Sequence, residues 1–128
     1  MAVPNVAPDK IAGVTFPGGS EMAERIRALD WSKTALGPPE AWPQNLKSAV
    51  AICPDSRMPI VIWWNREPAI QFYNDAYISF LGPTKHPEFL GRSGRECWQE
   101  IWDRMGPLWD TVFVERKATW SQDFLYVI

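Results

Sequence analysis

The sequence predicts an α+β domain in which a β-hairpin is combined with short amphipathic helices. Residues 60–64 (IVIWW) form a continuous apolar run with β-branched members, and residues 69–73 (AIQFY) form a second run. Both runs are too short for typical helices and favour strands, and the first is expected to be buried. Residues 65–68 between them read Asn-Arg-Glu-Pro, which is typical of a turn.

Two helices are expected before the hairpin. Residues 1–19 contain three prolines, three glycines and no amphipathic period, so we expect a mobile tail. Ser20 is a suitable N-cap for a helix over residues 21–29, with Glu21 and Glu24 in its first turn, where acidic side chains favour the helix dipole. The apolar face of this helix contains Met22, Ile26 and Leu29.

A proline-rich segment separates this helix from the next one. Residues 30–43 contain three prolines and are expected to form a loop without regular structure. Pro43 suits the first turn of a second helix, which Pro54 and Asp55 end. The apolar face of the second helix contains Leu46, Ala49, Val50 and Cys53.

The hairpin is followed by a short helix. Asn74 or Asp75 can cap this helix, and Gly82–Pro83 terminates it. Its expected apolar members are Ala76, Tyr77, Phe80 and Leu81.

The remaining elements are expected to be mostly helical. Residues 86–91 predict one helical turn, and residues 94–105 predict a helix with an apolar face. Gly106 and Pro107 are expected to break that helix and to start another, with Pro107 at its first position. Residues 120–128 are rich in strand-forming types and predict a strand.

The composition excludes several classes of function. The chain has 128 residues, which suits one domain, and a net charge of −2 without any basic run, so nucleic-acid binding is not expected. No apolar run approaches the length of a membrane span, and the N-terminus lacks a secretory signal pattern. Cys53 and Cys97 are far apart and form no CxxC motif, which favours free thiols in a cytoplasmic protein.

The order of these elements, together with the NDAY sequence of residues 74–77 after the second strand, resembles the PAS fold. A second signature is similar to the segment that precedes the PAS core in a group of bacterial sensor histidine kinases. It comprises DWS at 30–32, Thr34, LGPP at 36–39, WP at 42–43 and Leu46, and later HP at 86–87, LG at 90–91 and WQEIW at 98–102.

The resemblance covers about residues 20–128 and implies a five-stranded antiparallel sheet with helices on one face. Residues 20–56 would form an N-terminal helical extension, and residues 57–128 would form the PAS core. The chain would supply the first three strands, near 60–64, 69–73 and 120–127. We therefore expect a sequence truncated before the last two strands of the sheet.

Catalytic and cofactor chemistry is not expected within this segment. His86 is the only histidine and lies beside a proline, where a turn residue that binds backbone is expected. Haem is disfavoured because the relatives that bind it use a histidine on the long helix, which here has none. A flavin photo-adduct is disfavoured because Gly94 replaces the cysteine of the G-x-N-C-R frame and Cys97 lies three residues later. Glu96, Glu100 and Asp103 are expected to form a solvated helix face rather than a metal site.

The resemblance implies a sensor that regulates a downstream histidine kinase through a conformational change. We expect a pocket for a small apolar or aromatic ligand, although a filled core without a cavity is the alternative. A homodimer is expected, and the alternatives to the ligand sensor are a dimerisation module using the face of helix 21–29, or a sensor for another output such as a diguanylate cyclase or a phosphatase. The candidate pocket residues are Tyr77, Leu81, Trp98, Trp102, Trp109 and Phe113.

Overall fold

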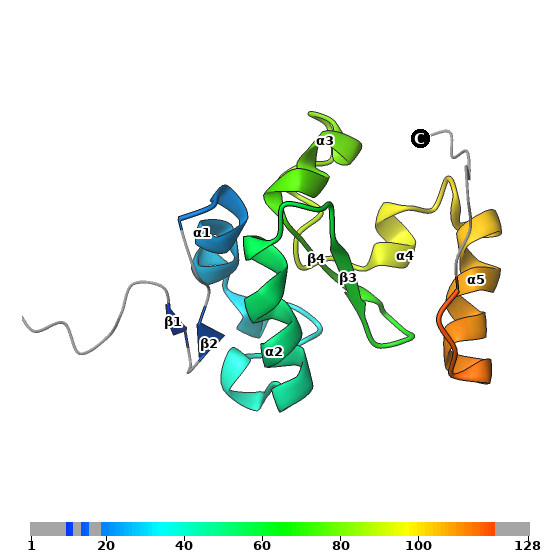
Figure 1. Cartoon of the computed structure of the whole chain (residues 1–128), viewed down its shortest axis with the longest axis horizontal. Coiled ribbons are helices and arrows are strands. Elements are labelled where there is room, and N and C mark those ends of the chain that lie inside the picture. Colours follow the sequence, from blue (N-terminus) through cyan, green and yellow to red (C-terminus); the bar gives the residue numbers. More distant parts are fainter. Residues whose placement is uncertain (1–9, 12–13, 16–18, 120–128) are drawn as a thin grey trace, which may run out of the picture.

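A β-hairpin lies at the centre of the computed structural model, which describes residues 10–11, 14–15 and 19–119. Figure 1 shows helices α1 and α2 on one side of this hairpin and α5 on the opposite side. The expected α+β class is confirmed, since the described residues combine helices with antiparallel strands. The strand expected over residues 120–128 lies outside the described residues.

The hairpin consists of β3 (Val61–Trp64) and β4 (Ile70–Tyr73), which pair antiparallel with Val61 opposite Tyr73 and Trp64 opposite Ile70. On its other side, β4 pairs with the segment that follows Leu90. Gln71 N–H donates to the Arg92 carbonyl, and Gly91 N–H donates to the Gln71 carbonyl. β4 therefore has backbone partners on both edges.

The burial of the two strands differs from the prediction. All four residues of β4 are buried, whereas all four residues of β3 are only half-buried, so the expectation that residues 60–64 form a buried strand is wrong. The reason is the position of each strand. β4 lies between β3 and residues 91–94, while β3 has a strand neighbour on one side only within the described residues.

The two N-terminal helices agree with the prediction. α1 (Glu21–Ala28) begins after Ser20, whose side chain accepts from Ala23 N–H, and α2 (Gln44–Ile52) begins directly after Pro43. Between them, the proline-rich segment contains two short 3₁₀ helices, η1 (Trp31–Lys33) and η2 (Pro39–Ala41). The expected absence of regular structure there is wrong, because a proline at the first position of a 3₁₀ turn is compatible with its geometry.

The N-terminal helices and the hairpin share one hydrophobic core. The ring of Trp31 stacks on that of Phe72 at 4.7 Å, and Trp42 packs edge-on against both rings. Met22 and Ile26 are fully buried in the same cluster. Two of the three predicted apolar residues of α1 are thus used inside the molecule, and dimerisation through this helix stays a prediction.

A short strand pair precedes α1. β1 (Lys10–Ile11) pairs antiparallel with β2 (Val14–Thr15). These residues fall within the range 1–19, for which mobility stays a prediction.

The turn after β4 is built around Asn74, as the sequence predicts. Asn74 caps η4 (Asp75–Tyr77), which continues into α3 (Ile78–Leu81), and Gly82 ends α3 with a φ of 72°. Phe80 is exposed, however, so it does not belong to an apolar inner face. The chain then forms hydrogen-bonded turns over residues 82–92, including Phe89 N–H to the Lys85 carbonyl.

The C-terminal helices differ most from the prediction. α4 (Gly94–Cys97) is one turn long, and α5 (Trp102–Glu115) runs through Gly106 and Pro107 without a break. The break lies earlier, over residues 98–101, where the indole of Trp98 is buried in the core and donates to the Gln71 side chain. No helix in the described ranges is long and apolar enough to cross a membrane.

Candidate functional site

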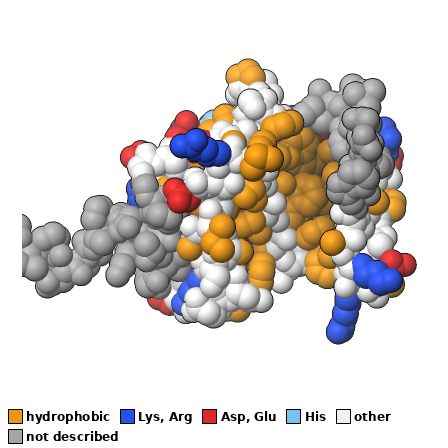
Figure 2. Space-filling view, in the orientation of Figure 1, with side chains coloured by type: hydrophobic (Ala, Val, Ile, Leu, Met, Phe, Trp, Pro, Cys, Tyr) orange, Lys and Arg blue, Asp and Glu red, His pale blue; other side chains and the backbone are white. Residues whose placement is uncertain are grey.

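A cavity of about 260 Å³ lies where the hairpin turn, α4 and α5 meet. It combines aromatic and charged side chains, which distinguishes it from the apolar core. Figure 2 shows hydrophobic side chains gathered in a hollow on the side of the central strands that faces the α5 region. The residues that line the cavity are Glu67, Arg95, Trp102, Asp103, Gly106, Pro107, Trp109 and Asp110.

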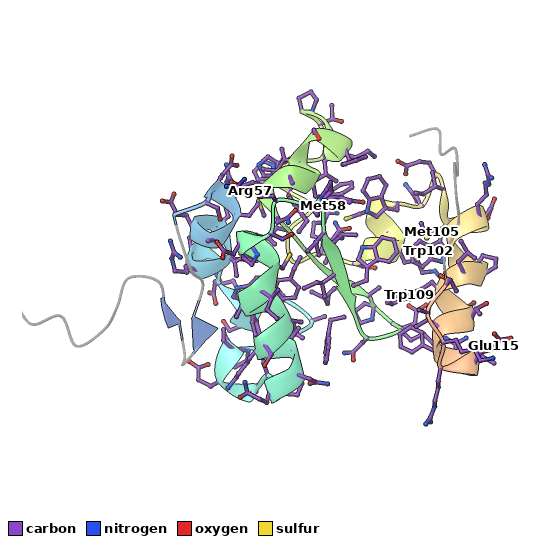
Figure 3. All side chains as sticks on the ribbon, in the orientation of Figure 1. Arg57, Met58, Trp102, Met105, Trp109 and Glu115 are labelled. Carbon is purple, nitrogen blue, oxygen red and sulfur yellow. The ribbon has the colours of Figure 1, made fainter. Side chains whose placement is uncertain are left out.

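An aromatic cluster connects β3 with α5 at this site. The ring centroid of Trp63 lies 5.6 Å from that of Trp102 and 5.5 Å from that of Trp109. Trp109 in turn packs edge-on against Phe113 at 4.8 Å. Figure 3 shows Trp102 and Trp109 projecting from α5 toward the hairpin, so these indoles fill the space between the two elements. Such ring pairs add stability beyond the area that they bury.

Two glycines make room for the indoles of this cluster. A Cβ at Gly94 would lie 2.8 Å from Nε1 of Trp63, and a Cβ at Gly106 would lie 2.9 Å from Nε1 of Trp102. Both distances are too short for a side chain. Each glycine therefore serves as a flat surface on which an indole edge rests.

Polar contacts attach the hairpin turn to α4 and α5. The guanidinium of Arg66 lies 3.1 Å from the carboxylate of Asp110, and the indole of Trp109 donates to the Arg66 carbonyl at 3.1 Å. On the other side of the turn, Arg95 forms an ion pair with Glu67. These side chains are largely exposed, so each contact adds little stability.

A buried amide fixes two of the tryptophans. The Gln71 side chain accepts from Nε1 of Trp63 at 2.8 Å and from Nε1 of Trp98 at 2.7 Å, and it donates to the Phe89 carbonyl. Because Gln71 is fully buried, these bonds form away from competing water. The orientation of Trp63, and through it of the aromatic cluster, depends on this amide.

The structure separates the predicted pocket residues into different environments. Trp102 and Trp109 line the cavity, and Phe113 contacts Trp109 beside it. Leu81 and Trp98 are buried in the core. Tyr77 packs against Tyr73 and Phe80. Only the α5 residues are thus brought together, and a common pocket for all six is not formed by the described residues.

A second polar cluster joins α1 to the hairpin. The Tyr73 hydroxyl lies 2.8 Å from His86 Nδ1, and His86 Nε2 lies 2.6 Å from the Glu21 carboxylate. The side chain of His86 binds other side chains, so the expectation that it binds backbone is wrong. Hydrogen bonds from Arg25 and His86 hold the pKa of Glu21 below its ordinary value, and burial raises the pKa of Tyr73.

Asp75 also attaches the start of α1 to the turn after β4, because its carboxylate accepts from the backbone N–H groups of Glu21 and Met22.

The two thiols have little chemical reactivity. Burial raises the pKa of Cys53 to about 12 and the pKa of Cys97 to about 11. Both thiols are therefore protonated at neutral pH, in a state that is a poor nucleophile. The cysteines are free, as the sequence predicts.

Three acidic residues near α4 were expected to be solvated. Glu96, Glu100 and Asp103 are exposed, and Glu100 forms an ion pair with Lys85 at 2.7 Å. Within the part of the chain that the structure describes, no group of three or more histidine, cysteine, aspartate or glutamate residues could hold a metal ion.

The prediction missed Trp63 and the charged wall of the cavity. Trp63 belongs to a continuous apolar run, and without alternating polar residues such a run does not indicate which of its side chains face a cavity. Glu67, Arg95 and Asp110 are far apart in the sequence, so only the fold brings them together. Gly94 and Gly106 could have indicated this site from the sequence, since a glycine in a helical segment often marks a place where another group packs closely against the backbone.

Comparisons with known proteins found no match to this chain among protein-family models, curated proteins or solved structures.

Proposed function

We propose that this chain is a sensory input domain of the PAS type from a bacterial sensor histidine kinase, in which a small ligand at the α5 cavity changes the packing of α5. The observation that carries the proposal is the way in which α5 is held. Among its 14 residues only Gly106 is buried. By contrast, three of the eight residues of α1 are buried in the core.

The contacts of α5 with the hairpin are individually weak. The Arg66 and Asp110 side chains are 50% and 56% exposed, and an ion pair of this kind is worth about 0–1 kcal/mol. The hydrogen bond from Trp109 adds about 1 kcal/mol, and the ring contacts with Trp63 add about 0.5–1.5 kcal/mol each. A ligand that prefers one arrangement of α5 by a few kcal/mol can therefore shift its population.

The position of α5 suits a role in signal transfer. It supplies most of the residues that line the cavity, so a ligand bound beside Trp102 and Trp109 would act directly on the packing of this helix. The kinase output itself rests on the resemblance of residues 20–128 to the histidine-kinase group, since a fold does not determine its partner.

The flavin and haem routes remain disfavoured under this proposal. Gly94 occupies the cysteine position of the photo-adduct frame, and a side chain there would collide with Trp63. Cys97 is buried and protonated. The ligand is instead a molecule that binds without a covalent bond.

Paired spin labels test the proposal. Met58 and Val114 are about 70% exposed and can be replaced by cysteine, while the native thiols are buried and label slowly. The distance between labels on Met58→Cys and Val114→Cys would be measured with and without a panel of small aromatic compounds, such as indole and phenol, and organic cations.

The expected result is a shift or narrowing of that distance distribution with at least one compound. A control pair, Glu24→Cys and Ile52→Cys, lies on helices that are packed in the core and should not respond. If no compound changes the α5 distance while the native mass shows a dimer, the ligand-sensor proposal is refuted in favour of an association module.

A further inference from the structure

We propose that the cavity at α5 accepts a small organic cation of the ammonium class, held between the indoles of Trp102 and Trp109 and the carboxylate of Asp103. This inference rests on the proposed function, because it names the ligand class of the same site. It goes beyond the expectation of an apolar or aromatic ligand, and it depends on the charges that the fold gathers at the cavity.

The charge of the cavity favours a cation. Three carboxylates, those of Glu67, Asp103 and Asp110, and one guanidinium, that of Arg95, line it, which leaves a formal charge of −2. Arg66 pairs with Asp110 from outside the lining and reduces this to −1. A bound monovalent cation would neutralise the remaining charge.

Asp103 is the carboxylate that stays available. Glu67 is paired with Arg95, and Asp110 with Arg66. Asp103 makes no ion pair with any residue of the described ranges. It directly follows Trp102 in α5, so the free charge and an indole come from adjacent positions on the same wall of the cavity.

The aromatic residues add the second element of recognition. A cation is attracted to an aromatic ring within about 6 Å, most strongly to tryptophan, and quaternary ammonium groups are recognised in this way. The same cluster already holds a cation at its edge, since the Arg66 guanidinium lies 6.0 Å from the Phe113 ring centroid. Lys85 makes equivalent contacts with Phe89 and Trp98 elsewhere in the molecule.

Two other ligand classes fit the cavity less well. For an anion, the cavity lining offers one cationic side chain, Arg95, whose charge is already balanced by Glu67. The carboxylates of Asp103 and Asp110 would repel an anion. A divalent metal prefers several oxygen ligands in close array, and the described residues hold no group of three such side chains. The volume of about 260 Å³ suits a small molecule.

A matched pair of probes tests the inference. Choline and 3,3-dimethylbutan-1-ol have the same shape, but the second carries a carbon in place of the ammonium nitrogen and has no charge. Each would be titrated into the ¹⁵N-labelled protein while the indole N–H resonances of Trp102 and Trp109 are followed. We expect saturable shifts of these two resonances with choline and an affinity at least about tenfold weaker for the neutral alcohol.

Isosteric variants identify the carboxylate. Asp103→Asn should weaken choline binding by about threefold to tenfold, because it removes the unpaired charge and keeps the shape. Asp55→Asn removes one exposed carboxylate in η3 that does not line the cavity, so it should stay within about twofold of the unchanged protein. Equal affinity for the two probes, equal effects of the two variants, or no saturable shift would each overturn the cation inference.

The outcomes also separate this inference from the proposed function. Choline binding without any change in the spin-label distance across α5 would support the cation site and refute the sensor mechanism. A response of α5 to an aromatic compound, together with no response to choline, would leave the sensor proposal standing and overturn the cation class.

Discussion

Asn74 is the side chain whose replacement gives the most decisive test of this fold. It is fully buried, and its amide nitrogen lies within hydrogen-bond distance of the carbonyls of Cys53, Ser56 and Met58, at 3.1, 3.2 and 2.8 Å. Its side-chain oxygen accepts from Ile60 N–H at 3.1 Å and from Tyr77 N–H at 3.2 Å. One residue thus connects the end of α2, the start of β3 and the turn after β4.

The loss of unfolding free energy caused by Asn74→Ala depends on which backbone groups lose their only hydrogen-bond partner. Tyr77 N–H retains the Asn74 backbone carbonyl, and the Cys53 carbonyl retains Ser56 N–H. Ile60 N–H and the Ser56 carbonyl have no other hydrogen bond within the described residues. At about 1–3 kcal/mol for each of these two unpaired groups, the expected loss of unfolding free energy is about 2–6 kcal/mol.

At pH 7, Asn74→Asp should lower the unfolding free energy at least as much as Asn74→Ala, since a carboxylate would face three carbonyl oxygens. The protonated acid can still donate to the Met58 carbonyl, so the folded state favours the neutral form and raises the pKa of the introduced acid above its ordinary value of about 3.9. The loss of stability is therefore smallest below about pH 4 and grows, by up to about 1.4 kcal/mol per pH unit, as the pH rises toward the folded pKa.

Urea denaturation followed by far-ultraviolet circular dichroism at pH 4 and pH 7 measures both effects. With a typical slope of about 1–3 kcal/mol per molar urea, a loss of 3 kcal/mol lowers the midpoint by about 1–3 M. Asn45→Asp in the first turn of α2 is the matched control, because Asn45 is exposed and an acid there favours the helix dipole. An Asn74→Asp protein as stable as the control at pH 7, or a deficit independent of pH, would refute the reasoning.

Three further substitutions or treatments test other parts of the structure. Gly91→Ala should lower the unfolding free energy by about 1–3 kcal/mol in the same urea assay, because φ is 79° and the new Cβ would lie 2.7 Å from a methyl carbon of Leu29; a neutral effect would contradict this packing. Iodoacetamide at pH 8 should modify Cys53 and Cys97 at least about a hundredfold more slowly in the folded than in the urea-unfolded protein, since burial raises the pKa of both thiols well above the pH; equal rates would contradict their burial. Trp109→Phe removes one indole hydrogen bond to the hairpin turn and should broaden the spin-label distance across α5 while changing global stability by about 1 kcal/mol or less, and an unchanged distribution would show that this bond does not hold the helix.

Much of the local structure was predictable because its causes are local. The cap at Ser20, the stop at Gly82 and the turn at Asn74 each depend on hydrogen bonds or backbone freedom within a few residues. The hairpin followed from two short apolar runs and the turn between them. Periodicity placed Met22 and Ile26 on a buried face, since a helix that covers a sheet must turn such a face inward.

The candidate site was only partly predictable. Trp102 and Trp109 were expected in it, but on two helices separated at Gly106 and Pro107. In the structure both lie on the single helix α5, and this brings them to the same cavity. Leu81 and Trp98 were expected there as well, but the sheet holds them in the core. The difference lies in where each helix rests against the hairpin, and periodicity within a helix carries no information about that.

The sequence by itself determined which segments become helices and strands and where most of them end, because caps, turn residues and apolar spacing act within one or two turns of the chain. Only the tertiary structure decided that β4 rather than β3 is fully buried, that α5 passes through Gly106 and Pro107, and that Glu67, Arg95 and Asp110 meet at one cavity. Burial and charge at a site depend on neighbours that come from distant parts of the chain. Such neighbours are fixed only when Gln71 and Asn74 join the separate segments into one core.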